Sequence, residues 1–273
     1  MHTLIPSRVA RSATGNGPTS SASLYSCWAS SPAEVRAAQS LRQRVFFDEM
    51  GARVTNESGA AGELDVDRFD EFCDHLLIKS RGPNEPEDDE VVGTYRVLSP
   101  ESARQAGGYY TETEFDMRSW HSQRQGMAEL GRSCVHPEWR RGAVIMMLWT
   151  ALGAYMQHRG LSTLVGCCSV PLWDDGATAR ALWTDLSRSH LVEEASRVYP
   201  RKPFDVAPTG RGRSDSDAQL PVPALMKGYL RCGATLLGAP AYDAAFDTAD
   251  FPMMLRLADL TPAYRQHFMG SAS

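Results

Sequence analysis

An acid and an arginine three residues apart stand in the strand-like segment 127–135, where they are candidates for acid–base chemistry. Glu129 and Arg132 enclose Leu130 and Gly131. A carboxylate in such a segment acts as a general base when partial burial raises its pKa from about 4.3 toward neutrality. A neighbouring arginine opposes that rise, so Arg132 is expected to bind a donor group or to hold the site together. A buried structural ion pair between the two residues is the alternative.

Four more charged residues precede this pair in the order arginine, aspartate, aspartate, arginine. They are Arg42, Asp67, Asp70 and Arg96, and Phe46 follows the first of them by about one helical turn. Carboxylates bind ammonium groups through charge-assisted hydrogen bonds, so the two aspartates are candidates for binding a cationic amino acid. An aspartate–arginine network that shapes the wall of a site is the alternative. Phe46 is interpreted as a core residue rather than a substrate contact.

A predicted helix begins near Pro137 and has the features of an anion site. Free backbone N–H groups at a helix N-terminus bind phosphate, and Arg140 and Arg141 would add charge-assisted hydrogen bonds. With Gly142 and Ala143 they form the predicted donor or phosphate site. Helix-start charges that bind no ligand are the alternative.

Composition narrows the classes of function. The chain has 273 residues and a net charge of −5, so its bulk charge does not suggest nucleic-acid binding. No apolar run approaches the roughly 18 residues of a membrane-spanning helix, and a cytoplasmic protein is expected. The six cysteines form no C-x-x-C pair and no histidine stands at ligand spacing from them, so buried reduced thiols and no metal site are predicted. Residues 118–159 hold six arginines against two acids, which either favours an acidic partner or reflects ordinary surface charge.

Periodicity predicts an α/β fold with a single mixed, mostly antiparallel sheet flanked by helices. The segment 161–170 is nearly continuously apolar, which is typical of a strand covered on both faces, and its Cys167 and Cys168 should point to opposite faces. No Walker or G-x-G-x-x-G pattern occurs, which argues against nucleotide chemistry. The predicted strands cover 24–29, 73–79, 91–98, 126–135, 161–170 and 251–257, and the predicted helices cover 32–50, 99–106, 140–159, 177–189, 221–232 and 262–269.

The spacing of the charged residues resembles that of the autoinducer-synthase branch of the N-acyltransferase superfamily. In that branch an arginine, an aromatic residue, paired aspartates, a second arginine, a glutamate and a third arginine shape the site. The matching positions are Arg42, Phe46, Asp67, Asp70, Arg96, Glu129 and Arg132. The turn 139–144 is similar to the acyl-CoA-binding turn of N-acetyltransferases, although its first and last positions depart from that pattern. The resemblance implies a GNAT-like acyltransferase fold.

The second half of the chain resembles the bacterial L-ornithine N-alpha-acyltransferase family instead. The resemblance rests on segments 129–137, 164–170, 223–234 and 247–251. It implies transfer of a 3-hydroxyacyl group from the phosphopantetheine arm of acyl carrier protein to the α-amino group of ornithine, which gives lyso-ornithine lipid without a cofactor. It also implies that residues 24–273 form one acyltransferase domain, with 171–273 as a family-specific extension. Residues 1–23 are rich in Ser, Thr and Gly and contain no acid, which predicts a disordered tail.

The resemblance implies roles and partners. Glu129 and Arg132 are the expected catalytic pair. The expected substrate-binding residues are Arg42, Phe46, Asp67, Asp70 and Arg96. Acyl carrier protein and ornithine are the expected partners, while peripheral contact with inner-membrane lipid and the oligomeric state are left open. A covalent acyl-enzyme on Cys134 is disfavoured, because direct attack by an amine needs no covalent step.

Two alternative functions are kept. The first is an autoinducer synthase or another amino-acid N-acyltransferase, for example one that uses S-adenosylmethionine, and the C-terminal motifs argue against it. The second is a non-catalytic acyl-carrier-binding or toxin-like protein, and the intact Glu129 and Arg132 argue against that.

Overall fold

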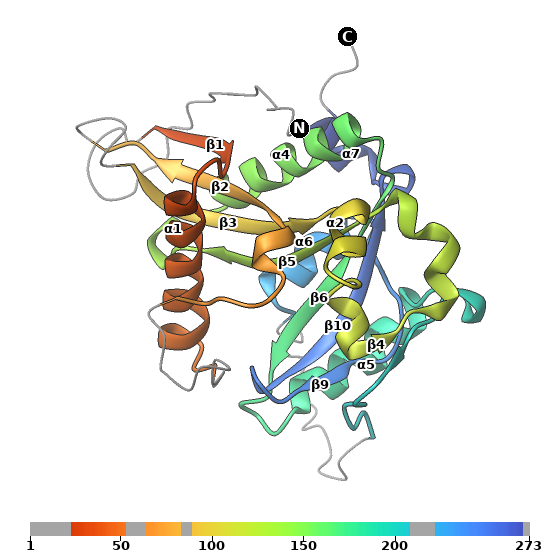
Figure 1. The fold of residues 1–273 in the computed structure, drawn as a ribbon. Helices are drawn as coiled ribbons and strands as arrows, with labels where there is room; N and C mark the ends of the chain where they lie inside the picture. Colours follow the sequence, from red (N-terminus) through yellow and green to blue (C-terminus); the bar gives the residue numbers. More distant parts are fainter. Residues whose placement is uncertain (1–22, 53–63, 83–88, 208–221, 270–273) are drawn as a thin grey trace.

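Eight strands form one mixed sheet (Figure 1). The computed structural model describes residues 23–52, 64–82, 89–207 and 222–269. The strands of the sheet are β1 (Leu24–Trp28), β2 (Asp74–Ser80), β3 (Glu90–Leu98), β5 (Met127–Val135), β6 (Thr163–Pro171), β8 (Thr235–Leu236), β9 (Ala241–Asp243) and β10 (Thr248–Arg256). Their order is β1-β2-β3-β5-β6-β10-β8, and β9 also pairs with β10. A small second sheet joins β4 (Phe115–Asp116) to β7 (Tyr199–Pro200).

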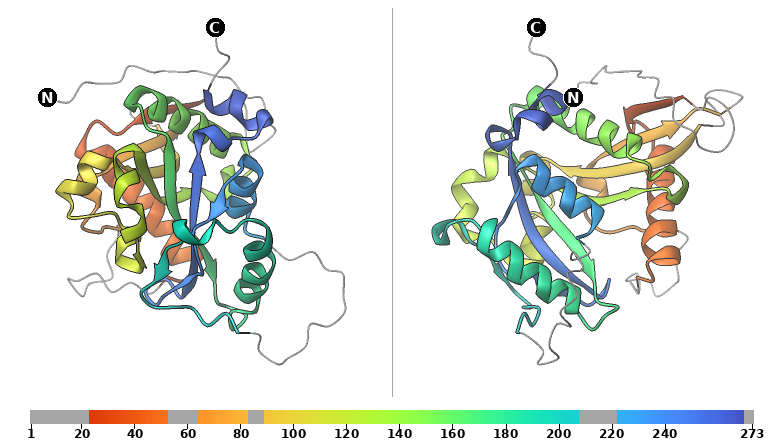
Figure 2. Two further views of the ribbon diagram at one scale, coloured as in Figure 1. Left: turned by 90° about the vertical axis from the view of Figure 1, so that its right-hand side faces the viewer. Right: turned by 180° about the vertical axis from the view of Figure 1, so that it is seen from behind.

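Strands β5 and β6 are parallel and separate after three residue pairs. Their pairing begins at Met127 with Thr163 and ends at Glu129 with Val165. Beyond that point β5 stays paired with β3, and β6 stays paired with β10 as far as Pro171. The sheet therefore divides into two halves, and Figure 2 shows β6 and β10 turning away from β3 and β5.

A β-bulge bends β5 where the two halves separate. Arg96 of β3 lies opposite Gly131 and Thr94 lies opposite Cys134, so β5 carries one more residue than β3 over this stretch. Arg132 takes a φ of 51°, in the left-handed region that side chains rarely adopt. A bulge of this kind bends its strand and redirects the side chains around it.

Helices cover both faces of the sheet. They are α1 (Pro32–Gln43), α2 (Pro100–Gln105), α3 (Thr111–Glu114), α4 (Ala143–Arg159), α5 (Ala177–Ser189), α6 (Ala224–Cys232) and α7 (Pro262–Met269). The largest buried cluster joins one face to α4, α5, α6 and α7, whereas α1 and α2 bury side chains against the other face. A π-helix, Arg44–Glu49, continues α1, and 3-10 turns cover Asp70–Phe72, Arg118–Gly126, Pro137–Trp139, Glu194–Ser196 and Leu257–Asp259.

Close packing positions α4, the helix that links β5 to β6. A Cβ atom at Gly93 of β3 would lie 2.4 Å from Val144 Cγ1, so only glycine lets the start of α4 approach the sheet this closely. The helix ends at Gly160, whose φ of 62° suits the left-handed cap. The connection from β5 to β6 through α4 is the crossover that a parallel pair requires.

The predicted fold class is confirmed, with local corrections. The helix predicted over 140–159 begins at Ala143, because Pro137–Trp139 form a 3-10 turn before it. The short elements α3, β8 and β9 were not predicted, since two to four residues give no measurable periodicity. Cys167 and Cys168 belong to clusters on opposite faces, as expected.

Some predictions concern regions that the structure does not test. The predicted tail, 1–23, lies outside the described residues except for residue 23. The division into one domain and an extension stays a prediction, although β8, β9 and β10 complete the sheet from within 171–273. Among the described residues, no helix is long and apolar enough to cross a membrane.

Candidate active site

A cavity of about 540 Å³ occupies the gap between the two halves of the sheet. Side chains from both faces line it, together with residues of β5, β6, β10, α6 and the π-helix. Five of the residues predicted from sequence reach it, namely Phe46, Arg96, Glu129, Arg132 and Arg140. The bend in β5 and the loss of pairing with β6 therefore border the space that these five residues line. The other predicted site residues, Arg42, Asp67, Asp70, Arg141, Gly142 and Ala143, do not line it.

Glu129 lies at the last paired position of β5 and β6, and the carboxylate is held by donors from the start of α3. The Tyr110 N–H donates to Oε2 at 2.7 Å, and the Thr111 N–H donates to Oε1 at 2.6 Å. The Thr111 hydroxyl also donates to Oε1. A carboxylate offers about four lone-pair sites, so Oε2 keeps one for a substrate or a water molecule.

Burial raises the pKa of Glu129 above its ordinary value. The hydrogen bonds from Thr111 and Tyr110 and the charge of Arg96 oppose this rise without cancelling it. Only 4% of the residue is exposed. A desolvated carboxylate of this kind is a stronger base than one in water, as a general base for an amine requires.

Arg132 does not pair with Glu129, so the alternative of a structural ion pair between them is wrong. Its Nη2 lies 3.1 Å from Asp67 Oδ2, and its Nε lies 3.2 Å from Asp65 Oδ2. The guanidinium also lies over the ring of Phe246, with 4.8 Å from Cζ to the ring centroid. Arg132 has its left-handed backbone at this bulge, and from there its side chain reaches the same Asp67 that Arg96 binds.

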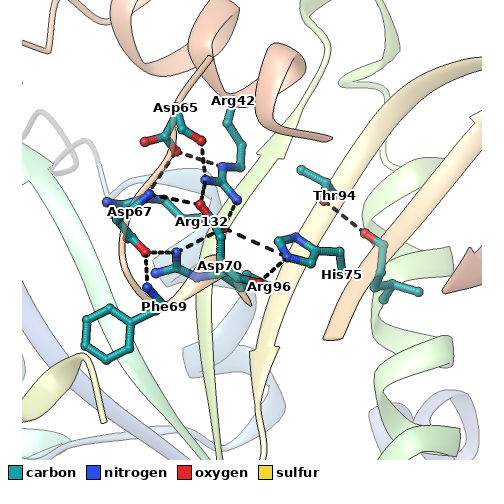
Figure 3. Close-up of polar contacts among 10 residues, drawn as sticks. Arg42, Asp65, Asp67, Phe69, Asp70, His75, Thr94, Arg96 and Arg132 are labelled. Atoms are coloured by element: carbon teal, nitrogen blue, oxygen red, sulfur yellow. Dashed lines mark hydrogen bonds and ion pairs between the residues drawn. The ribbon is translucent and has the colours of Figure 1, made fainter. Parts of the chain in front are cut away.

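Three arginines and three aspartates form a network beside the cavity, the arginine–aspartate cluster (Figure 3). Its members are Arg42, Asp65, Asp67, Asp70, Arg96 and Arg132. Arg42 donates to Asp65 Oδ2 and Asp70 Oδ1, both at 2.7 Å. Arg96 donates to Asp67 Oδ1 at 2.6 Å and to Asp70 Oδ1 at 3.3 Å.

The arginines in this cluster compensate its carboxylates. Burial alone would raise the pKa of Asp67, but Arg96 and Arg132 outweigh it and hold that pKa below its ordinary value. Burial also acts on Asp70, where Arg42 and Arg96 hold the pKa well below the usual range. The structure therefore places both predicted aspartates in the network that was the alternative to direct binding of a cation.

Sequence reasoning missed Asp65, the residue that Arg42 and Arg132 share. It is 4% exposed, and its backbone oxygen also accepts from Arg42 at 2.5 Å. The spacing of three aspartates at positions 65, 67 and 70 was the available signal, because a third acid beside a predicted pair favours a network.

Phe46 lines the cavity from the π-helix as well as packing in a cluster. Its ring lies edge-on to Phe246, with centroids 6.2 Å apart. It is half-buried, so the interpretation as a core residue alone is incomplete.

The predicted donor turn reaches the rim of the cavity through one residue. Arg140 lines the cavity, donates to the backbone oxygen of Val135 at 3.1 Å and pairs with Glu49 Oε2 at 2.7 Å. Gly142 has a φ of 96° immediately before α4, whose first N–H groups begin at Ala143. Arg141 stands in the same turn and does not line the cavity.

A second acidic group, also missed from sequence, lines another part of the cavity wall. We call Glu114, Asp243 and Asp250 the acidic wall; Asp243 and Asp250 line the cavity directly. Burial and the nearby charge of Asp250 raise the pKa of Glu114 to about 8, and burial and Asp243 raise that of Asp250 to about 6. The signal for Asp250 was a carboxylate inside an apolar strand, where an acid is costly unless it has a function or a partner.

One group of described residues could hold a metal ion. It consists of Glu114, Cys167 and Asp250, whose ligand atoms all lie within 4.8 Å of one another. The absence of a metal site stays a prediction. Burial raises the pKa of Cys134 to about 12, so that thiol is protonated at neutral pH.

Comparison with known proteins identifies the family of the chain. The acetyltransferase (GNAT) domain family matches residues 41–150. The L-ornithine N(alpha)-acyltransferase of Brucella abortus (strain 2308) is 35% identical over 90% of this chain and 88% of its own. The chain belongs to the L-ornithine N(alpha)-acyltransferase family. The member from Rhizobium meliloti (strain 1021) is 34% identical over 92% of this chain and 86% of its own.

Membership in the L-ornithine N(alpha)-acyltransferase family makes the chain an acyltransferase. A solved structure, the AHL synthase LasI, superimposes with a TM-score of 0.51 at 13% identity and covers 92% of this chain and 96% of LasI. At that identity the likeness shows a shared fold, which includes the mixed sheet.

Proposed function

We propose that the chain transfers a 3-hydroxyacyl group from acyl carrier protein to the α-amino group of L-ornithine and so forms lyso-ornithine lipid. The position of Glu129 carries the proposal, because a buried carboxylate with one free lone pair faces the cavity where β5 leaves β6. The names of the relatives support ornithine as the acceptor.

The proposed reaction is a direct attack. Glu129 removes a proton from the α-ammonium group, directly or through a water molecule, and leaves a neutral amine. The nitrogen attacks the thioester carbonyl carbon, the C–N bond forms and the C–S bond breaks. As the tetrahedral intermediate collapses, the departing thiolate takes up the proton that Glu129, or the bridging water, received, and the second amine proton then passes to the regenerated Glu129 or to water. The products are an amide and the free thiol of the phosphopantetheine arm.

The donor is proposed to enter along β5 and the start of α4. Within the part of the chain that the structure describes, β5 and β6 pair no further than Glu129, and the backbone of β5 beyond that point is the proposed place for the thioester. The phosphate of the arm would lie at the first N–H groups of α4, near Arg140 and Arg141. A phosphate there would offer the Arg140 guanidinium an acceptor other than Glu49.

An assay with defined donors and acceptors tests the proposal. Purified protein is incubated with 3-hydroxyacyl-carrier protein or the matching coenzyme A thioester, and with ornithine or S-adenosylmethionine. Mass spectrometry should detect N-acyl-ornithine from the carrier-protein donor. Transfer to S-adenosylmethionine, or no thioester consumption with any pair, would overturn the proposal.

The base is tested by Glu129→Gln. The variant is expected to lose about 10²–10⁴-fold in kcat with a similar donor KM, because the amine keeps its proton more often. Glu138→Gln, at an exposed position in the following turn, is the matched control and should retain activity. Full activity of Glu129→Gln would remove the base from the mechanism.

Donor docking is tested by Arg140→Glu and Arg141→Glu. Each charge reversal is expected to raise the KM for the carrier-protein thioester several-fold at low salt and less at high salt. Arg188→Glu, exposed on α5, is the control. Unchanged kinetics in both variants would place the carrier protein elsewhere.

A further inference from the structure

The acidic wall holds carboxyl groups to which the described residues offer no salt bridge. Among the ion pairs of the described residues, none involves Glu114, Asp243 or Asp250. Asp250 is 3% exposed and accepts a hydrogen bond from the Thr248 hydroxyl at 2.7 Å. The Cys167 thiol donates to Glu114 Oε2 at 3.5 Å. Buried carboxylates supported only by neutral donors are costly, and a bound cation would offset that cost.

The acidic wall and Glu129 lie on one face of the sheet. Val165 is paired with Glu129, and Cys167 is two residues further along β6 on the same side. Asp250 of β10 lies opposite Ser169, again on that side. The charges of Glu114, Asp250 and Glu129 all raise the pKa of Cys167, together with its burial, so the three carboxylates share one neighbourhood.

The spacing along β6 matches a diamino acid. Two residues of a strand span roughly 6.6 Å. The α and δ nitrogens of ornithine are separated by five bonds of about 1.5 Å, which reach roughly 6 Å in a staggered chain. An α-amino group beside Glu129 would therefore bring the δ-nitrogen to the level of Cys167, where Glu114 and Asp250 approach each other.

We propose that Glu114 and Asp250 bind the side-chain ammonium group of the acceptor and so select a diamino acid over a neutral one. The inference rests on the proposed function and deepens it, because it assigns recognition of the acceptor to the acidic wall. The arginine–aspartate cluster is unsuited to that task, since its own arginines already compensate its carboxylates. An ammonium group between Glu114 and Asp250 would lower the pKa of both and make charge-assisted hydrogen bonds to them.

The deciding measurement compares ornithine with norvaline, which has the same carbon chain without the δ-amine. Asp250→Asn and Glu114→Gln are each expected to lower kcat/KM for ornithine about 10- to 100-fold and to leave that for norvaline nearly unchanged. Asp185→Asn, exposed on α5, should alter neither value. An equal loss with both amino acids, or no loss, would overturn the inference.

Calorimetric binding of the two amino acids without any donor separates this inference from the proposed function. Tighter binding of ornithine than of norvaline, with the difference lost in Asp250→Asn, supports the inference. This holds even if no acyl transfer occurs, and in that case only the proposed function fails. Equal affinity for ornithine and norvaline in the unmodified protein overturns the inference while acyl transfer can stand. Stoichiometric Zn²⁺ binding that Glu114→Gln abolishes would also overturn it, by assigning the group to a metal.

Discussion

Two groups of buried carboxylates lie near one cavity, and they differ in how their charge is compensated. In the arginine–aspartate cluster, Asp65, Asp67 and Asp70 are paired with three guanidinium groups at 2.6–3.3 Å. In the acidic wall, the described residues offer Glu114 and Asp250 no ion pair, and the hydrogen-bond donors are neutral groups such as the Cys167 thiol and the Thr248 hydroxyl. The first arrangement holds the pKa of Asp67 and Asp70 down, and the second leaves the pKa of Glu114 and Asp250 raised.

Charge compensation distinguishes the acids that stabilise the protein from those that are available to a ligand. A compensated carboxylate contributes to the folded state because its partner is always present. A carboxylate without an ionic partner keeps its capacity to bind a cation, at a cost to stability. The two groups should therefore respond in opposite ways to substitution and to pH.

The largest expected effect on stability comes from removing an arginine of the arginine–aspartate cluster. Arg42→Ala leaves Asp65 and Asp70 without their principal partner and should lower the free energy of unfolding by about 3–5 kcal/mol. For a chain of this size each kcal/mol corresponds to roughly 2–4 °C in Tm. Thermal unfolding measures it, with Arg118→Ala as the control, because Arg118 pairs with Asp116 on the surface and its loss should leave Tm unchanged. Wild-type stability of Arg42→Ala would show that the cluster does not hold the fold.

A substitution in the acidic wall is expected to have a smaller effect, and it should raise the free energy of unfolding at high pH instead of lowering it. The pKa of Glu114 is raised from 4.5 to about 8. Between these values the folded protein keeps a proton that the unfolded chain has lost, so the free energy of unfolding falls as pH rises. Glu114→Gln has no proton to lose. Its free energy of unfolding, measured relative to that of the unmodified protein, should therefore be higher at about pH 8 than at about pH 5, by on the order of 1–3 kcal/mol.

Urea unfolding at a series of pH values measures this difference. The arginine–aspartate cluster provides the internal contrast, because the lowered pKa of Asp67 gives stability that is present above its ordinary pKa of 3.8 and is lost as pH falls through the folded value. A pH profile of Glu114→Gln that runs parallel to that of the unmodified protein would contradict the raised pKa.

The smallest expected effect concerns the electrostatic interaction between the arginine–aspartate cluster and the acidic wall. Arg132 pairs with Asp65 and Asp67, and its charge also lowers the pKa of Asp250, although burial dominates there. Arg132→Gln should therefore raise the pKa of Asp250 further, which carboxyl ¹³C NMR titration can follow. An unchanged Asp250 titration would mean that the two groups act independently.

Most regular elements followed from periodicity. The apolar run of β6 and the amphipathic α5 were predicted to within two residues of their ends, because a long repeat of apolar positions reports burial directly. The 3-10 turn before α4 and the π-helix after α1 were not predicted. They cover three and six residues, which is too short for a periodic pattern to distinguish them from the adjoining α-helix.

The candidate site was predicted in part. Glu129, Arg132 and Arg96 were chosen from their spacing, and all three line the cavity. The ion pair between Glu129 and Arg132, which was the alternative, was wrong, because Arg132 pairs with Asp65 and Asp67 from a left-handed bulge that has no signature in the local sequence. Glu114 and Asp250 were not chosen, since they stand more than 130 residues apart in the chain.

Side-chain type and spacing were enough to predict the fold class, the family and the seven residues from Arg42 to Arg132 that match the autoinducer-synthase pattern. They did not predict which acids are compensated. Charge compensation depends on distances of about 3 Å between atoms of remote segments, and these distances are set by the point where β5 leaves β6 and by the bulge at Arg132. Spacing along the chain predicts which residues share a face, whereas the packing of α3, β6 and β10 determines which charges meet.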